Sequence, residues 1–225
     1  MTTDEIREKL NSKKSADRKR GAKEIGKLKI YELVEELYLK YLTEKADTRT
    51  WETQCEMIKA LGNVDFKKAI PEMEQIVQKN LPHDMITSVS ATTYVQLKRS
   101  SINDASVVVE LLETGSVSVI CGAHLALAID KMIPEEHDIK KILSLSKDIN
   151  KHKDRIGLEY GLIDSRIYLA IACANWNIEL TRDFLNHCIE TAYNINSFGK
   201  PVINQNLIDV CQNSLKGKFS KAYLS

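Results

Sequence analysis

The sequence contains few of the residues that interrupt regular secondary structure. In 225 residues it has 4 prolines and 9 glycines, and aromatic residues make up 6% of the chain. An all-β protein of this length needs turn residues at short, regular intervals. The scarcity of proline and glycine therefore argues against a β-sandwich or barrel and favours long helices joined by short loops.

Long apolar runs and cysteine pairs are also absent. No stretch of about 18 apolar residues, the length that spans a bilayer, occurs in the sequence, and the N-terminal segment MTTDEIREKL has no apolar signal core. The cysteines form no CxxC pair, and their odd number and wide spacing argue against a disulfide framework. We expect buried thiols in a reducing compartment, and hence a cytoplasmic protein without a membrane anchor. The five cysteines are Cys55, Cys121, Cys173, Cys188 and Cys211.

The sequence also has no excess of one charge and no catalytic motif. The formal net charge is +1, from 32 basic and 31 acidic residues, whereas dedicated nucleic-acid-binding proteins usually carry a strongly basic face. None of the five histidines belongs to an HExxH motif or to a pair four residues apart, so no metal site is expected. Phosphate-binding loops, dinucleotide-binding glycine motifs and GxSxG are absent. We therefore expect a non-enzymatic protein with no catalytic residues and no cofactor.

Apolar residues recur at spacings of three and four along the whole chain, which is the helical period. Val34, Leu37 and Tyr41 are one example, and the spacing of Thr2 and Glu5 predicts a capping box at the first helix. Because no long linker divides the helices, we expect one domain over residues 1–225. The first helices of six predicted pairs are expected at 3–11, 31–44, 66–80, 103–114, 135–151 and 178–195. The second helices are expected at 15–29, 48–62, 83–99, 116–131, 157–175 and 202–216.

Two segments of the N-terminal third are similar to each other. The segment DRKRGAKEIGKL begins at Asp17, and QCEMIKALGNV begins at Gln54. Aligning Gly26 with Gly62 gives a shift of 36 residues. Internal similarity at a fixed period of this size indicates stacked helical repeats.

These segments resemble HEAT repeats, in which an A helix is followed by a turn with aspartate and a B helix with an early arginine. Asp17 and Arg18 stand at those two positions, and Gln54 replaces the arginine in the second copy. The resemblance implies an all-α fold, a right-handed α-solenoid of about six helical hairpins whose B helices line the concave side. We also expect a monomer. Further matches to the B helix are Ala60, Leu61 and Gly62, and Asp164, Arg166, Ala170 and Ala172.

Basic residues form one candidate binding face. Arg20, Lys23 and Lys27 share one side of the helix expected at 15–29, opposite Ala22 and Ile25. Such a face suits an acidic protein or a phosphate. The alternative is a solvated face, because a terminal repeat must be polar to remain soluble.

Apolar residues form a second candidate face on the later B helices. Opposite the core-facing stripe, these helices carry large apolar side chains, and tryptophan is enriched in binding hot spots. The alternative is internal packing, since the inner helices of a solenoid are buried on several sides. The candidate residues of this face are Leu125, Ile129, Leu169 and Trp176, and Trp51, the other tryptophan, and Tyr168 are further candidate binding residues.

Three functions are compatible with this fold. The first is a non-enzymatic protein-binding scaffold, acting as an adaptor or as an inhibitor such as an immunity protein, with another protein as its partner. The second is nucleic-acid binding or DNA repair, because alkylpurine DNA glycosylases have a similar HEAT-like architecture and length. They need a groove carboxylate flanked by aromatic residues, and Asp164 with Tyr160, Tyr168 and Trp176 is the nearest grouping. The third is a HEAT-like bilin lyase, for which no motif is present.

Overall fold

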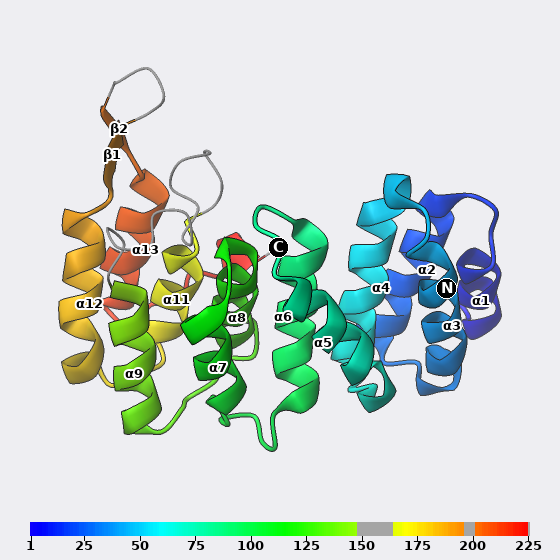
Figure 1. Cartoon of the computed structure of the whole chain (residues 1–225), viewed down its shortest axis with the longest axis horizontal. Coiled ribbons are helices and arrows are strands. Elements are labelled where there is room, and N and C mark those ends of the chain that lie inside the picture. The colour runs from blue at the N-terminus through cyan, green and yellow to red at the C-terminus, as the bar shows by residue number, and fades with distance from the viewer. Residues whose placement is uncertain (148–163, 196–200, 225) are drawn as a thin grey trace. The chain divides into compact units, whose positions relative to one another are not determined.

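The computed structural model describes residues 1–147, 164–195 and 201–224 (Figure 1). Helices account for most of these residues, so the predicted all-α class is confirmed. Among the described residues, no helix is long and apolar enough to cross a membrane. The chain forms two compact units, one of Met1–Lys79 and Met85–Lys98 and the other of Asn80–Asp84 and Arg99–Ser225.

The first unit consists of paired helices. Its helices are α1 (Thr3–Leu10), α2 (Ser15–Leu28), α3 (Val34–Glu44), α4 (Trp51–Asn63), α5 (Ile70–Lys79) and α6 (Met85–Lys98). Helix α4 packs between α2 and α6, while α1, α3 and α5 pack against α2, α4 and α6 respectively. Fully buried side chains such as Leu37, Ile58 and Leu61 fill the space between the two rows.

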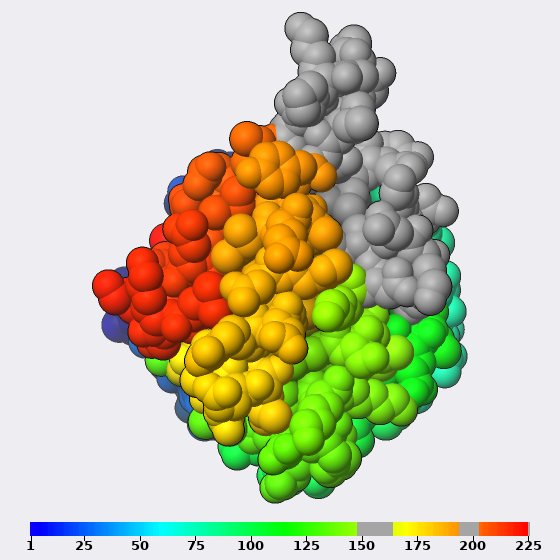
Figure 2. Space-filling view, turned by 90° about the vertical axis from the view of Figure 1, so that its left-hand side faces the viewer, coloured from blue at the N-terminus to red at the C-terminus, as the bar shows by residue number. Residues whose placement is uncertain are grey.

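The second unit has the same kind of layering. Its helices are α7 (Ser106–Thr114), α8 (Val117–Ile129), α9 (Glu136–Lys147), α11 (Arg166–Cys173), α12 (Ile178–Glu190) and α13 (Gln205–Ser214). One row runs α8, α11, α13 and the other α7, α9, α12, with α7 against α8 and α12 against α13. Figure 2 shows α12 in yellow and orange, between α9 in green and the red residues that include α13.

Two predicted helices are shorter than expected because a small hairpin replaces their ends. The helix predicted at 178–195 ends at Glu190, and strands β1 (Tyr193–Ile195) and β2 (Pro201–Ile203) form an antiparallel pair. Proline has no N–H for a helical hydrogen bond, and the side chain of Asn204 caps α13 by accepting from Leu207 N. The helix predicted at 202–216 therefore begins at Gln205. Residues 148–151 and 157–163 of two other predicted helices lie outside the described residues.

The ends of the helices in the first unit combine expected and unexpected chemistry. The capping box is confirmed, because Thr2 Oγ1 accepts from Glu5 N and Glu5 Oε2 accepts from Thr2 N. Gly26, however, lies inside α2, which Lys29 terminates with a left-handed φ of 51°. A Cβ at Gly26 would lie 2.8 Å from Ala60 Cα. This glycine therefore permits close approach of α2 and α4, a role that its position near a predicted helix end did not reveal.

Candidate functional site

The face formed by Arg20, Lys23 and Lys27 is referred to below as the basic face of α2. All three side chains are exposed, and their spacing of three and four places them on one side of the helix. The opposite side of α2 is buried, with Ala22 and Ile25 fully inaccessible. The structure thus brings together the three cations that the sequence analysis grouped.

The neighbouring cations of α2 have acidic partners, whereas the basic face has none. Arg18 holds Glu44 through two hydrogen bonds of 2.6 and 2.7 Å, and Lys19 Nζ lies 2.6 Å from Glu52 Oε2. Burial alone would raise the pKa of the Glu44 carboxyl, but these hydrogen bonds from Arg18 lower it. Within the described part of the chain, Arg20, Lys23 and Lys27 form no ion pair. Three positive charges therefore remain available to an external anion.

The exposed side of α8 is apolar. Cys121 and Leu125 are half-buried and Ile129 is 42% exposed, and their spacing of four residues makes one stripe. Tyr168 of α11, by contrast, is only 8% exposed, and burial raises its pKa to about 12. Cys121, Leu125 and Ile129 are referred to below as the apolar face of α8. Cys121 belongs to it although the sequence analysis did not single it out.

Three other predicted binding residues have different positions. Leu169 is fully buried in α11, and Trp176 is 6% exposed with its Nε1 donating to Met132 O at 2.7 Å. Side chains this well covered present little surface to a partner. Trp51 is 44% exposed at the first residue of α4. Two residues further along α4, the Thr53 hydroxyl oxygen lies 2.6 Å from that of Ser15, the first residue of α2. Trp51 therefore lies near the start of α2.

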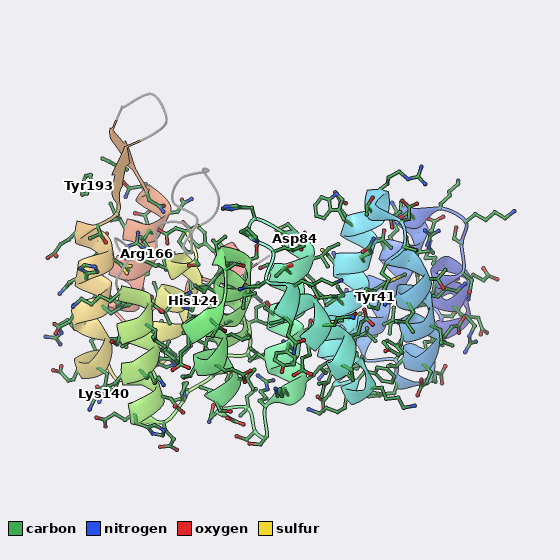
Figure 3. The ribbon with its side chains drawn as sticks, in the orientation of Figure 1. Tyr41, Asp84, His124, Lys140, Arg166 and Tyr193 are labelled. Carbon is green, nitrogen blue, oxygen red and sulfur yellow. The ribbon has the colours of Figure 1, made fainter. Side chains whose placement is uncertain are left out.

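A polar network is buried between α8 and α11, where Figure 3 labels His124 and Arg166. His124 Nδ1 donates to Ser165 O, and Nε2 accepts from Ser146 Oγ, both at 3.0 Å. Burial lowers the pKa of His124 to about 4, so the ring is neutral near pH 7. The sequence gives only a weak indication of this network, because a single histidine among apolar residues belongs to no recognisable motif.

The carboxylate considered for DNA repair belongs to the same buried region. Asp164 is paired with Arg166, and both side chains are 1% exposed. The carboxylate is thus neutralised and covered, which leaves it out of reach of a bound base in this structure. Tyr160, which was grouped with it, lies outside the described residues.

The described residues contain no group of three or more His, Cys, Asp and Glu side chains that could hold a metal ion. Comparisons with models of known protein families, with curated proteins and with solved structures found no match. Among the described residues, we take the basic face of α2 and the apolar face of α8 as candidate binding surfaces.

Proposed function

We propose that the protein is a non-enzymatic binding module, built from HEAT-like helical pairs, that binds a protein partner through the basic face of α2. The observation that carries the proposal is the contrast within one helix. Arg18 and Lys19 are engaged by Glu44 and Glu52, whereas the cations of the basic face point outward without acidic partners in the described structure. Complementary charge on a partner steers association and fixes orientation.

The regular spacing of packing contacts supports a repeat architecture. Gly26 faces Ala60 and Gly62 faces Gln96, so equivalent glycines meet the next helix of the row 34 residues further along the chain. In the second unit, Asn80 donates to Thr114 O across the same separation of 34 residues. Contacts at a constant separation are expected when identical supersecondary units stack. We propose six such pairs in a right-handed solenoid, acting as a monomer.

A protein with an acidic surface suits this face better than nucleic acid does. The whole chain has a net charge of +1, and acidic residues such as Glu52 and Glu56 occupy the adjacent helix α4. Glu52 is already paired with Lys19, so Glu56 is the carboxylate that a phosphate backbone extending beyond α2 would approach, and like charges repel. An adaptor or an inhibitor, including an immunity protein that covers a toxin, would need its partner to present acidic residues only where that partner contacts the basic face of α2.

The experiment is affinity capture from lysate of the native host, with and without nuclease, using three forms of the full chain. The first is wild type, the second is R20E/K23E/K27E, and the third is the control K79E/K140E/K147E. The control reverses three exposed lysines elsewhere and changes the net charge by the same amount. Wild type and control should retain a nuclease-resistant stoichiometric protein. The α2 variant should bind that protein, once purified, at least about tenfold more weakly.

Two results would contradict the proposal. Equal binding by the α2 variant and the control would show that the basic face does not contact the partner. Loss of every captured protein after nuclease treatment would instead indicate nucleic acid as the ligand. Unfolding curves of the three forms, recorded by circular dichroism, distinguish lost binding from lost structure.

A further inference from the structure

Helices α2 and α4 pack side by side and run in the same direction (Figure 1). Near their starts, the hydroxyl oxygens of Ser15 and Thr53 lie 2.6 Å apart. Near their ends, Gly26 of α2 faces Ala60 of α4, and a Cβ at Gly26 would lie 2.8 Å from Ala60 Cα. Because neither residue at this contact has a long side chain, little separates the two helices there. Exposed residues that flank the contact therefore share one surface.

Lys59 and Asn63 extend the basic face of α2 onto α4. Successive residues of a helix are rotated by about 100°, so Lys23 and Lys27 both lie to one side of Gly26, the point that faces α4. The same rotation along the parallel helix α4 places Lys59 and Asn63 on that side as well. All four residues are exposed, and the Asn63 amide nitrogen would lie 3.2 Å from a Cβ at Gly26. One surface thus carries lysines from both helices.

The polar groups of this surface have no partner among the described residues. Lys59 forms no ion pair there, like Lys23 and Lys27, and the side-chain amide of Asn63 donates no hydrogen bond. The acidic residues of α4 all precede Lys59, and the first of them is engaged by Lys19. Three ammonium groups and one amide are therefore open to an external anion at the C-terminal half of the two helices.

We infer that the surface formed by Lys23, Lys27, Lys59 and Asn63 binds a short acidic segment of the partner, whose carboxylates cross from α2 to α4. The inference rests on the proposed function and adds to it the residues of α4 and the chemistry of the bound segment. Packed helices lie about 8–10 Å apart, and an extended chain covers roughly 3.3 Å per residue. Carboxylates two or three residues apart therefore reach lysines of both helices.

The charges around this surface favour a peptide over a nucleic acid. Glu56 lies on the same side of α4 as Lys59, three residues before it, and is half-buried. A nucleic acid carries a negative charge on every nucleotide, so a strand that followed α4 would bring a phosphate towards this carboxylate. A peptide can place carboxylates beside the lysines and a neutral or basic residue beside Glu56, which makes the charges complementary at each position.

Fluorescein-labelled hexaglutamate tests the inference with the full chain, by fluorescence anisotropy at low ionic strength, where exposed charges are least screened. The forms compared are wild type, K27Q, K59Q and the control K79Q, which neutralises an exposed lysine of α5. K27Q and K59Q should each bind the peptide about fivefold more weakly than wild type, the loss expected for one exposed ion pair. K79Q should bind as wild type does, and labelled hexaglutamine should not bind. Circular dichroism would verify that each variant is folded.

Three results would overturn the inference. A loss of binding in only one of K27Q and K59Q would show that the two helices do not share the bound segment. Failure of wild type to bind hexaglutamate would exclude an acidic segment, and tighter binding of a labelled hexanucleotide than of hexaglutamate would assign the surface to nucleic acid. The proposed function fails by a different measurement, namely unchanged capture of the partner after charge reversal in α2.

Discussion

The Arg166 guanidinium donates two hydrogen bonds to the Asp164 carboxylate at the beginning of α11, with Nε 2.9 Å from Oδ1 and Nη2 2.7 Å from Oδ2. Both side chains are 1% exposed, and Nη1 also donates to Thr191 Oγ1 at the end of α12. The pair thus joins the start of one helix to the end of another. A buried charge whose partner is removed is left uncompensated, so this contact should be far more sensitive to substitution than a surface pair.

Arg166→Met is therefore expected to lower the free energy of unfolding by about 3–5 kcal/mol, because it leaves the Asp164 carboxylate buried without its partner. The matched control is Arg182→Met, which removes an arginine that is 54% exposed and paired with the exposed Glu179. The control should cost about 0–1 kcal/mol. Urea denaturation of both variants measures the difference, and equal costs would show that the buried pair contributes no more than a surface pair.

The buried neutral state of His124 predicts a pH-dependent stability. Its pKa is lowered from 6.5 to about 4 in the folded protein, so the unfolded chain binds more protons between these values. The stability from His124 is fully present above pH 6.5 and is lost as pH falls towards 4. At about 1.4 kcal/mol per pKa unit, the loss amounts to roughly 3 kcal/mol.

Urea unfolding of wild type and His124→Gln, recorded at intervals from pH 7 to pH 4, would measure this contribution. Glutamine keeps a donor and an acceptor for Ser165 O and Ser146 Oγ but does not titrate. The variant should therefore lose less stability over this range than wild type does. Identical pH profiles would show that other groups cause the acid sensitivity.

The close approach at Gly26 predicts a difference between two glycine substitutions. In Gly26→Ala the new Cβ would lie 2.8 Å from Ala60 Cα and 3.0 Å from Ala60 Cβ, so α2 and α4 must separate. Overpacking of this kind costs about 1–3 kcal/mol. In Gly62→Ala the nearest atom is the flexible end of Gln96, which moves more easily. Thermal or urea unfolding should show the larger loss for Gly26→Ala, and the reverse order would contradict the helix contact.

The sequence located the helices well because helix formation is a local process. Hydrogen bonds within a helix join residues four apart, so periodicity and caps are visible in a short window. The same reasoning found the basic face, since Arg20, Lys23 and Lys27 need only a helical spacing to share a side. It failed at residues 193–195 and 201–203, where pairing between two separated segments replaced the helix.

The sequence by itself thus determined the all-helical class, most helix positions and the three cations on one side of α2. The tertiary structure decided which apolar side chains are covered. The buried indole of Trp176 donates to Met132 O, 44 positions away, and His124 Nδ1 donates to Ser165 O, 41 positions away. The packing of the 3-10 turn Lys221–Leu224 against α8 and α11 likewise joins segments that are distant in the sequence. Burial is set by segments that meet only after folding, and no local spacing encodes which segments those are.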